Sequence, residues 1–159
     1  MRSLLPVFAL ILLALSVSSW DSSDASEIDS CDAVYGYETH GSGHPYYYCI
    51  ITSVRTDVSI LRLPSVLEGY DVRTYASGSF TGCGAETLIV PKNVRTIEDG
   101  AFAGCGSLKD IYFMGDRPEI KGGLPEGVGI HTMPGTQGWN GTDRIEVVRL
   151  DGIDYAVLP

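Results

Sequence analysis

Cysteine and histidine side chains are the groups in this 159-residue sequence whose types and spacing could do chemistry. Cys31 and Cys49 bracket His40 and His44, and two thiolates with two imidazoles form a ligand set that Zn²⁺ accepts. In an oxidising compartment the same cysteines would form a disulfide that closes a loop of about 18 residues. Because "HGSGH" is not a helical sequence, the two imidazoles need not share a face. We expect the Cys31–Cys49 disulfide and no metal site, with zinc binding as the alternative.

The other two cysteines, Cys83 and Cys105, stand in the matching contexts "FTGCG" and "FAGCG". A reactive thiol needs exposure and a neighbouring base, and no histidine is near either residue in the sequence. Free cysteine otherwise behaves as a small apolar residue that is often buried. We therefore expect both thiols to pack in the core, and a disulfide between them is the alternative.

Motifs of the common enzyme classes are absent from the sequence, which has no Gly-x-Ser-x-Gly elbow, no phosphate-cradling loop and no His-Glu-x-x-His. The chain carries 20 acidic and 11 basic residues, a formal net charge of −9, and such a surface repels phosphate backbones. We predict no catalytic residue, no cofactor and no nucleic-acid partner, so the protein is not expected to be an enzyme.

An internal repeat positions these cysteines. "VRTYASGSFTGCG", at 72–84, recurs as "VRTIEDGAFAGCG" at 94–106. "LRLP" at 61–64 recurs as "LIVP" at 88–91 and more weakly as "IYFM" at 111–114, so the first interval between these strands is longer than the second. A period of roughly 20–29 residues is typical of leucine-rich repeats, in which each unit buries its apolar face only against its neighbours. The repeat predicts one stacked core column, made of Phe80, Cys83, Phe102 and Cys105.

The remaining segments of the repeat region are predicted from local signals. "DGAFAGC", at 99–105, is expected to form a one-turn helix with Asp99 as its N-cap. "SVLEGYD", at 65–71, is a turn-like insertion that lengthens the first unit, and 115–129 is rich in Gly and Pro and is expected to be loop. "IHTMPGTQGWNG", at 130–141, resembles a degraded terminal repeat with a strand followed by a turn.

A β-hairpin is predicted at the end of the chain, where Asp151-Gly152 separates two apolar runs. The expected register pairs Leu150 with Ile153, Arg149 with Asp154, and Val148 with Tyr155. The opposite charges of the second pair favour this register. Such a hairpin would cap the open end of a solenoid.

A secretory signal is predicted at 1–19, where Arg2 precedes a short apolar run and small residues follow. Removal of this signal would leave a net charge of −10. The alternative to a cleaved signal is that the same segment stays uncleaved and anchors the protein in a membrane. The expected organisation continues with a flexible acidic linker at 20–30, an N-terminal β cap at 31–60, leucine-rich repeats at 61–118, and the degraded terminal repeat with its hairpin cap at 119–159. The protein is therefore expected to be secreted or held at the cell surface.

Leu61 to Phe113 resembles the BspA-like leucine-rich-repeat family, whose units follow the pattern V-x-x-I-x-x-x-A-F-x-G-C-x-x-L-x-x-I-x-I-P. The first copy departs from this pattern, with Ser79 in place of Ala and Tyr75 in place of Ile, and it is one residue shorter before the following strand. The resemblance implies a β-rich solenoid that is exported, displayed and often involved in adhesion or binding. It implies no catalytic residues.

Three functions remain open from the sequence. The first is an exported binding or adhesion module that contacts a protein or glycan at a cell surface, and the second is an envelope or spacer protein without a specific ligand. The third and most remote is a small secreted zinc-binding protein or enzyme. A membrane partner is expected only if the N-terminal segment is uncleaved. "NGT" at 140–142 makes Asn140 a possible glycosylation site.

Overall fold

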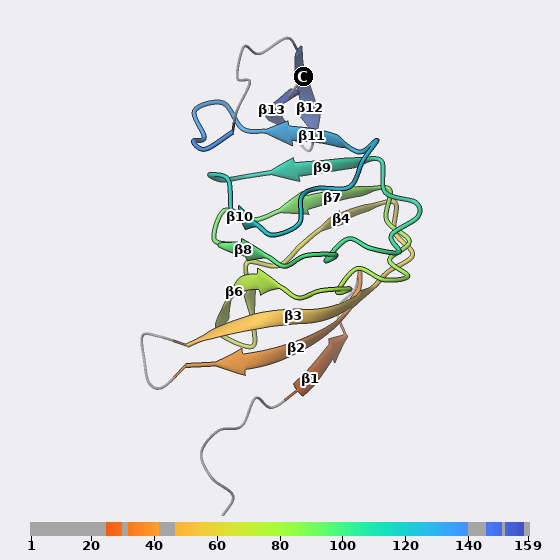
Figure 1. Ribbon diagram of the computed structural model, residues 1–159, viewed down its shortest axis with the longest axis vertical. Helices are drawn as coiled ribbons and strands as arrows, with labels where there is room; N and C mark the ends of the chain where they lie inside the picture. Colours follow the sequence, from red (N-terminus) through yellow and green to blue (C-terminus); the bar gives the residue numbers. More distant parts are fainter. Residues whose placement is uncertain (1–24, 30–31, 42–46, 140–145, 151, 158–159) are drawn as a thin grey trace, which may run out of the picture.

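The computed structural model describes residues 25–29, 32–41, 47–139, 146–150 and 152–157, and these residues form two sheets that wind around one core (Figure 1). The predicted signal at 1–19 and Asn140 lie outside the described residues. The first sheet has the order β1 (Ala25–Asp29), β2 (Val34–His40), β3 (Tyr48–Arg55), β6 (Tyr70–Tyr75), β8 (Thr96–Ile97) and β10 (Glu119–Ile120), with β5 (Val66–Leu67) paired to β6. The second has the order β12 (Glu146–Leu150), β13 (Ile153–Val157), β11 (Gly129–Thr132), β9 (Asp110–Phe113), β7 (Thr87–Val90) and β4 (Ile60–Arg62).

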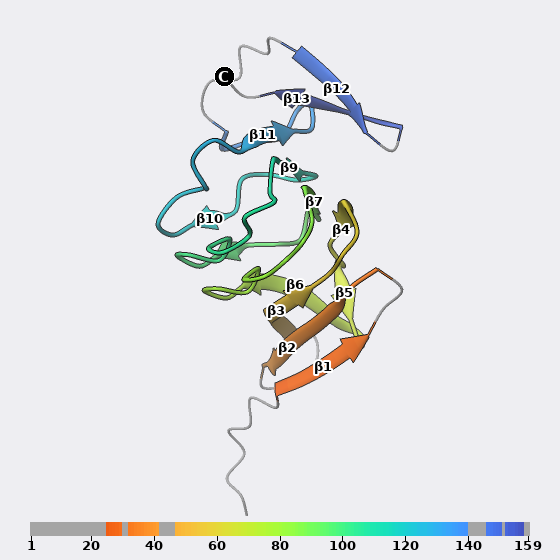
Figure 2. The same ribbon diagram turned by 90° about the vertical axis from the view of Figure 1, so that its right-hand side faces the viewer.

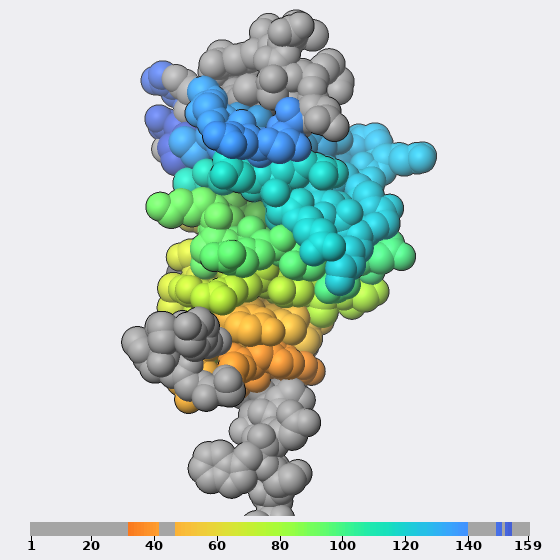
Figure 3. Space-filling model, turned by 60° about the vertical axis from the view of Figure 1, so that its left-hand side comes forward, coloured from red at the N-terminus to blue at the C-terminus, as the bar shows by residue number. Residues whose placement is uncertain are grey.

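The chain is a β-solenoid, as the repeat predicted. Strands β4, β7, β9 and β11 are parallel neighbours, and their registers align Leu61, Leu88, Ile111 and Ile130 in one row. The sequence interval along this row shortens at each step, so the turn that leads from Ile111 to Ile130 is the shortest of the three, and the degraded unit at 130–141 begins with the fourth strand of the row. In the first sheet, β3, β6, β8 and β10 are also parallel. Figure 3 shows the turns stacked in sequence order, from orange to blue.

The two sheets form two sides of the solenoid, and a column of tight turns forms the third. The one-turn helix predicted at 99–105 is therefore wrong. Ala101 donates its N–H to Glu98, Ala103 to Gly100 and Cys105 to Phe102, all three residues apart, and no helix occurs among the described residues. Asp99 lies inside the first of these turns and does not cap a helix. Gly100 and Gly104 have φ values of 68° and 80°, a left-handed conformation that ends a right-handed helix at each glycine.

Backbone hydrogen bonds join this turn column from one repeat to the next. The amide of Gly78 donates to the Gly100 carbonyl at 3.0 Å, and the amide of Gly82 donates to the Gly104 carbonyl at 3.3 Å. Each bond joins equivalent positions of the two copies at 72–84 and 94–106. The turns therefore stack in register, and glycines recur at the same positions because each turn needs the same backbone conformation.

The N-terminal side of the solenoid is an antiparallel extension of the first sheet. β2 pairs with β3, and β1 pairs with β2 (Figure 2). The flexible linker predicted at 20–30 is therefore wrong over Ala25–Asp29, which form β1. The acidic composition did not prevent pairing, because an exposed strand edge supplies backbone donors and acceptors to almost any side-chain sequence.

Two further segments carry more structure than expected. Glu119–Ile120, inside the predicted loop at 115–129, forms β10 and pairs in parallel with β8. The insertion at 65–71 forms a hairpin between β5 and β6, in which Leu67 pairs with Tyr70. Glu68 and Gly69 both have positive φ, 49° and 86°, which is the backbone of a type I′ turn.

The C-terminal hairpin has the predicted register. Strand pairing matches Leu150 with Ile153, Arg149 with Asp154, and Val148 with Tyr155. β13 then pairs antiparallel with β11, so the hairpin adds to the second sheet beyond its fourth parallel strand. Within the described part of the chain, no helix has the length and apolar character needed to cross a membrane.

Candidate functional site

The outward face of the second sheet carries a small apolar cluster of its own. Side chains alternate along each strand, so Leu88 and Ile111 enter the solenoid core while Ile89 and Tyr112 point the other way. Ile89 and Tyr112 are nevertheless buried, because half-buried neighbours cover them: Met114, Met133, Leu150 and Ile153. The outer face is therefore an apolar surface beside which a ligand could bind.

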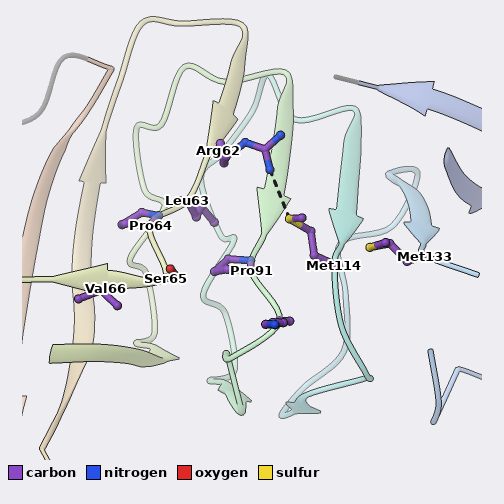
Figure 4. A pocket seen from close by; sticks show the side chains of 9 residues that line it. Arg62, Leu63, Pro64, Ser65, Val66, Pro91, Met114 and Met133 are labelled. Atoms are coloured by element: carbon purple, nitrogen blue, oxygen red, sulfur yellow. Dashed lines mark hydrogen bonds between the residues drawn. The ribbon is translucent and has the colours of Figure 1, made fainter. Parts of the chain in front are cut away.

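A groove opens next to this cluster, where the parallel strands end. Pro64, Pro91, Met114 and Met133 each follow β4, β7, β9 or β11 within two residues, and the strand registers bring them into one row. The groove has a volume of about 720 Å³ and is open to solvent. Figure 4 shows Val66 and Pro64 on one side of Pro91, with Met114 and Met133 on the other. The lining residues are Arg62, Leu63, Pro64, Ser65, Val66, Pro91, Lys92, Met114 and Met133.

The insertion in the first repeat builds one wall of the groove. Its strand β5 carries Val66, whose side chain is 49% exposed although it is aliphatic. The Ser65 carbonyl beside it accepts two hydrogen bonds, one from the Val72 amide at 2.9 Å and one from the Asn93 side-chain amide at 2.6 Å. The wall is thus fixed to its own hairpin and to the next repeat.

The residue types in the groove suit contact with an aliphatic side chain. Proline has no N–H, so Pro64 and Pro91 present ring carbons where a strand end would otherwise present a donor. Methionine is flexible and polarizable, so Met114 and Met133 can adapt to the shape of a ligand. Among the described residues that line the groove, none has an aromatic ring, a carboxylate or a side-chain amide.

Two cations are the charged residues of the described groove lining, although the chain as a whole has a net charge of −9. Arg62 lies on β4, and its Nη1 atom is 3.4 Å from the Sδ atom of Met114. Lys92 is exposed and directly follows Pro91. Both side chains bring positive charge to the groove lining in a molecule that is acidic overall.

A histidine–aspartate pair joins the third and fourth strands of this face. His131 Nε2 lies 2.7 Å from Asp110 Oδ1, and the imidazole stacks on the Tyr112 ring with centroids 4.2 Å apart. Gly129 leaves room for the pair, because an added Cβ would lie 2.5 Å from Asp110 Oδ1 and 3.0 Å from His131 Nε2 and would displace these side chains. His131 Nδ1 is buried and has no hydrogen-bond partner among the described residues. The pair therefore fixes β11 against β9.

The predicted core column is brought together in the structure. Phe80 and Phe102 are buried and stacked, with ring centroids 5.0 Å apart and an interplanar angle of 23°. Cys83 and Cys105 are free, buried thiols, and Cys105 Sγ lies 3.3 Å from the Cys83 carbonyl oxygen. A hydrogen bond between the thiols lowers the pKa of Cys83 and raises that of Cys105. Burial keeps both from reagents, so this geometry fits packing and not catalysis.

The Cys31–Cys49 disulfide does not form in the structure, where Cys49 is a free and fully buried thiol. Cys31 itself lies outside the described residues. The neighbouring Asp32 carbonyl accepts a hydrogen bond from the Thr56 hydroxyl, whereas Cys49 pairs with Thr39 near the start of β3. Asp32 therefore lies at the opposite end of β3 from Cys49.

Of the four ligands in the zinc alternative, the structure describes His40 and Cys49. His44 and Cys31 lie outside the described residues, and no group of three potential metal ligands occurs within them. His40 stacks on its cross-strand partner Tyr48, with ring centroids 5.6 Å apart. Because Tyr48 and Cys49 are consecutive in a strand, His40 and Cys49 face opposite sides of the sheet.

Sequence reasoning did not identify the groove, although part of its signal was present. The proline in "LRLP" and "LIVP" and the methionine in "IYFM" were aligned as repeat positions, which places them in one row. Val66 and Met133 come from the insertion and the degraded unit, where the repeat alignment fails. Their contribution depends on how these irregular segments pack.

Comparison with known proteins gives structural similarity only. No family model matches the sequence, and none of the curated proteins matches it. A leucine-rich cell surface protein from Faecalibacterium prausnitzii is similar in structure, with 20% identity and a TM-score of 0.44 over 63% of this chain and 28% of that one. The leucine-rich-repeat protein TpLRR of T. pallidum is also similar, with 22% identity and a TM-score of 0.40 over 68% and 65% of the two chains. The chain therefore spans less than two thirds of the length of each of these two proteins.

Proposed function

We propose that this protein is a protein-binding leucine-rich-repeat module of the BspA-like type, displayed outside the cell, and that its partner binds in the groove at the ends of β4, β7, β9 and β11. The observation that carries the proposal is the groove itself. It combines exposed Val66, two prolines and two methionines with two cations in an otherwise acidic molecule. A concave, mostly apolar cleft with a few polar groups is typical of binding sites on proteins.

A protein partner fits the groove better than a glycan partner. Sugars are held by hydrogen bonds to their hydroxyl groups and by stacking on aromatic rings, and the described lining supplies neither carboxylates, amides nor aromatic rings. Aliphatic side chains of a protein need only apolar contact and the exclusion of water. Display outside the cell is supported by the charge, apolar run and small residues at 1–19.

Site-specific photocrosslinking tests this function. The photoreactive residue p-benzoylphenylalanine replaces Lys92 in the groove or, as the control, Lys121, which lies outside the groove and pairs with Glu98. Intact cells of the producing organism are irradiated, and proteins joined to the Lys92 position alone are identified by mass spectrometry. The same samples give the mass of the mature chain, which is expected to begin near residue 20.

Binding of the purified partner then decides the assignment. Val66→Gln places a polar amide in the groove wall and is expected to weaken binding roughly tenfold, because the buried amide lacks partners. Ile60→Gln is the matched control, since Ile60 is similarly exposed at 48% but does not line the groove. A partner that crosslinks equally at both positions, or that binds the two glutamine variants alike, would overturn the proposed site.

A further inference from the structure

We infer that the groove binds an extended peptide in which one or two aliphatic side chains are flanked on both sides by carboxylates. This inference rests on the proposed function and names the partner's chemistry. It follows from where the apolar and the cationic residues lie relative to one another.

The apolar centre of the groove selects the aliphatic part of the ligand. Pro64 and Pro91 lie at the same level on neighbouring strands, because the β4–β7 register pairs Arg62 with Ile89 two residues earlier. Val66 stands on one side of this pair and Met114 on the other (Figure 4). Such a floor of ring carbons between aliphatic walls accommodates a leucine-sized side chain and leaves a polar one without hydrogen bonds.

The two cations stand on opposite sides of this centre along the strand direction. Arg62 precedes Pro64 by two residues on β4, and Lys92 follows Pro91 by one residue after β7. At about 3.3 Å per residue, their backbones are separated by roughly three residues of an extended chain. A peptide that places carboxylates about three positions apart can therefore reach both cations while its central side chains enter the apolar floor.

The charge of the rest of the molecule restricts where an acidic segment can bind. Beyond Met114 and Met133 the surface continues to Asp116, whose Oδ1 accepts a hydrogen bond from the backbone N–H of Gln137 at 2.8 Å. Carboxylates elsewhere on the molecule repel an acidic partner, because the chain as a whole has a net charge of −9. What distinguishes the groove is that its two cations lie beside an apolar floor, a combination that suits an acidic segment with aliphatic side chains.

Selection from a random ten-residue peptide library tests the inference. Phage that bind the immobilised protein are collected after removal of those that also bind the Val66→Gln variant, so that only groove-dependent sequences remain. The expected consensus has aspartate or glutamate on both sides of one or two leucine, isoleucine, valine or methionine residues. Groove-dependent peptides that are neutral or basic would overturn the inference and leave the proposed function standing.

Affinity measurements with the selected peptides separate charge from apolar contact. The double variant Arg62→Gln, Lys92→Gln is expected to bind them roughly tenfold more weakly by fluorescence anisotropy. Lys109→Gln, Lys121→Gln removes the same charge outside the groove and is expected to leave affinity unchanged, and Arg62→Lys is expected to retain binding. Equal affinity for both double variants, or a library without groove-dependent peptides, would overturn the inference. If the crosslinked partner still distinguishes Val66→Gln from Ile60→Gln, the proposed function survives that result.

Discussion

The Asn93 side-chain amide donates a hydrogen bond to the Ser65 carbonyl oxygen at 2.6 Å, joining two residues 28 positions apart. Ser65 begins the insertion that makes the first repeat longer than the second, and Asn93 lies in the turn that follows Pro91. The wall that carries Val66 is therefore held by a contact between repeats. This bond ties the wall of the groove to the next repeat.

Asn93→Ala is expected to destabilise the protein by about 1 kcal/mol, because the Ser65 carbonyl loses one of its two donors. Hydrogen exchange at Val66 and Leu67 is expected to accelerate, as the hairpin loses its attachment to the next repeat. Urea denaturation and exchange mass spectrometry measure the two effects. Asn93→Asp, which keeps the shape but cannot donate, should behave like the alanine variant. Retained protection in Asn93→Asp would show that the hydrogen bond does not hold the wall.

Phe80→Leu and Phe102→Leu are each expected to destabilise by about 1 kcal/mol and to show a coupling energy of about 0.5–1.5 kcal/mol in a double-mutant cycle, since the rings are stacked. The coupling is obtained from urea unfolding of the four proteins. Phe80→Leu with Tyr112→Leu serves as the control, because Tyr112 belongs to the separate outer cluster. Additive losses for the Phe80–Phe102 pair would contradict the importance of this stack.

Ser79→Ala is expected to stabilise the protein by about 1 kcal/mol. The Ser79 side chain is buried, and its hydroxyl has no hydrogen-bond partner among the described residues. The equivalent residue of the next repeat is Ala101, which is also buried. The reciprocal change Ala101→Ser should therefore cost a similar amount in thermal or urea unfolding. A loss of stability in Ser79→Ala would mean that the hydroxyl has a role the packing does not explain.

Stability is expected to fall between pH 9 and pH 11 through Cys49. Burial, followed by the charge of Asp71, raises the pKa of this thiol to about 11, compared with 9.0 for an unperturbed thiol. The folded state therefore holds the proton more tightly than the unfolded state. The protonated Cys49 thiol therefore contributes its full stabilisation of the folded state below pH 9, and this contribution is lost as the pH rises through 11. Burial also raises the pKa of Tyr75 well above 10, so a second loss follows at higher pH.

The contribution of Cys49 is isolated by comparison with Cys49→Ala. Urea midpoints measured from pH 8 to pH 11 are expected to fall more steeply for the natural protein than for the variant. Parallel pH profiles would show that another group is responsible for the change.

The solenoid could be predicted because it is indicated by the spacing of matching segments along the sequence. The constant offset between the matching segments places Phe80 beside Phe102 wherever the units stack in register, and the two rings are found stacked. The terminal hairpin was predicted to the residue for a similar reason, since a two-residue turn at Asp151-Gly152 determines the pairing on both sides. Such local rules do not depend on distant packing.

The errors occurred where the same residues are compatible with more than one backbone. "DGAFAGC" has an apolar pair and a possible cap, but its glycines adopt positive φ and produce separate turns instead of a helix. Ala25–Asp29 has the composition of a linker and becomes a strand because β2 has a free edge beside it. Cys49 is a residue that could form a disulfide in an exported protein. The antiparallel pairing of β2 with β3, however, places Asp32, the neighbour of Cys31 in the sequence, at the other end of β3.

The sequence by itself determined a repeating β-solenoid, its core column and its C-terminal hairpin, because each depends on residue types at fixed spacings. Only the tertiary structure decided that Val66, Pro91, Met114 and Met133 share one groove, since these residues belong to different turns and two of them to irregular segments. Their proximity arises from parallel strand registers and from a hairpin held by Asn93. A binding surface of this kind is a property of stacked turns, and no single turn contains it.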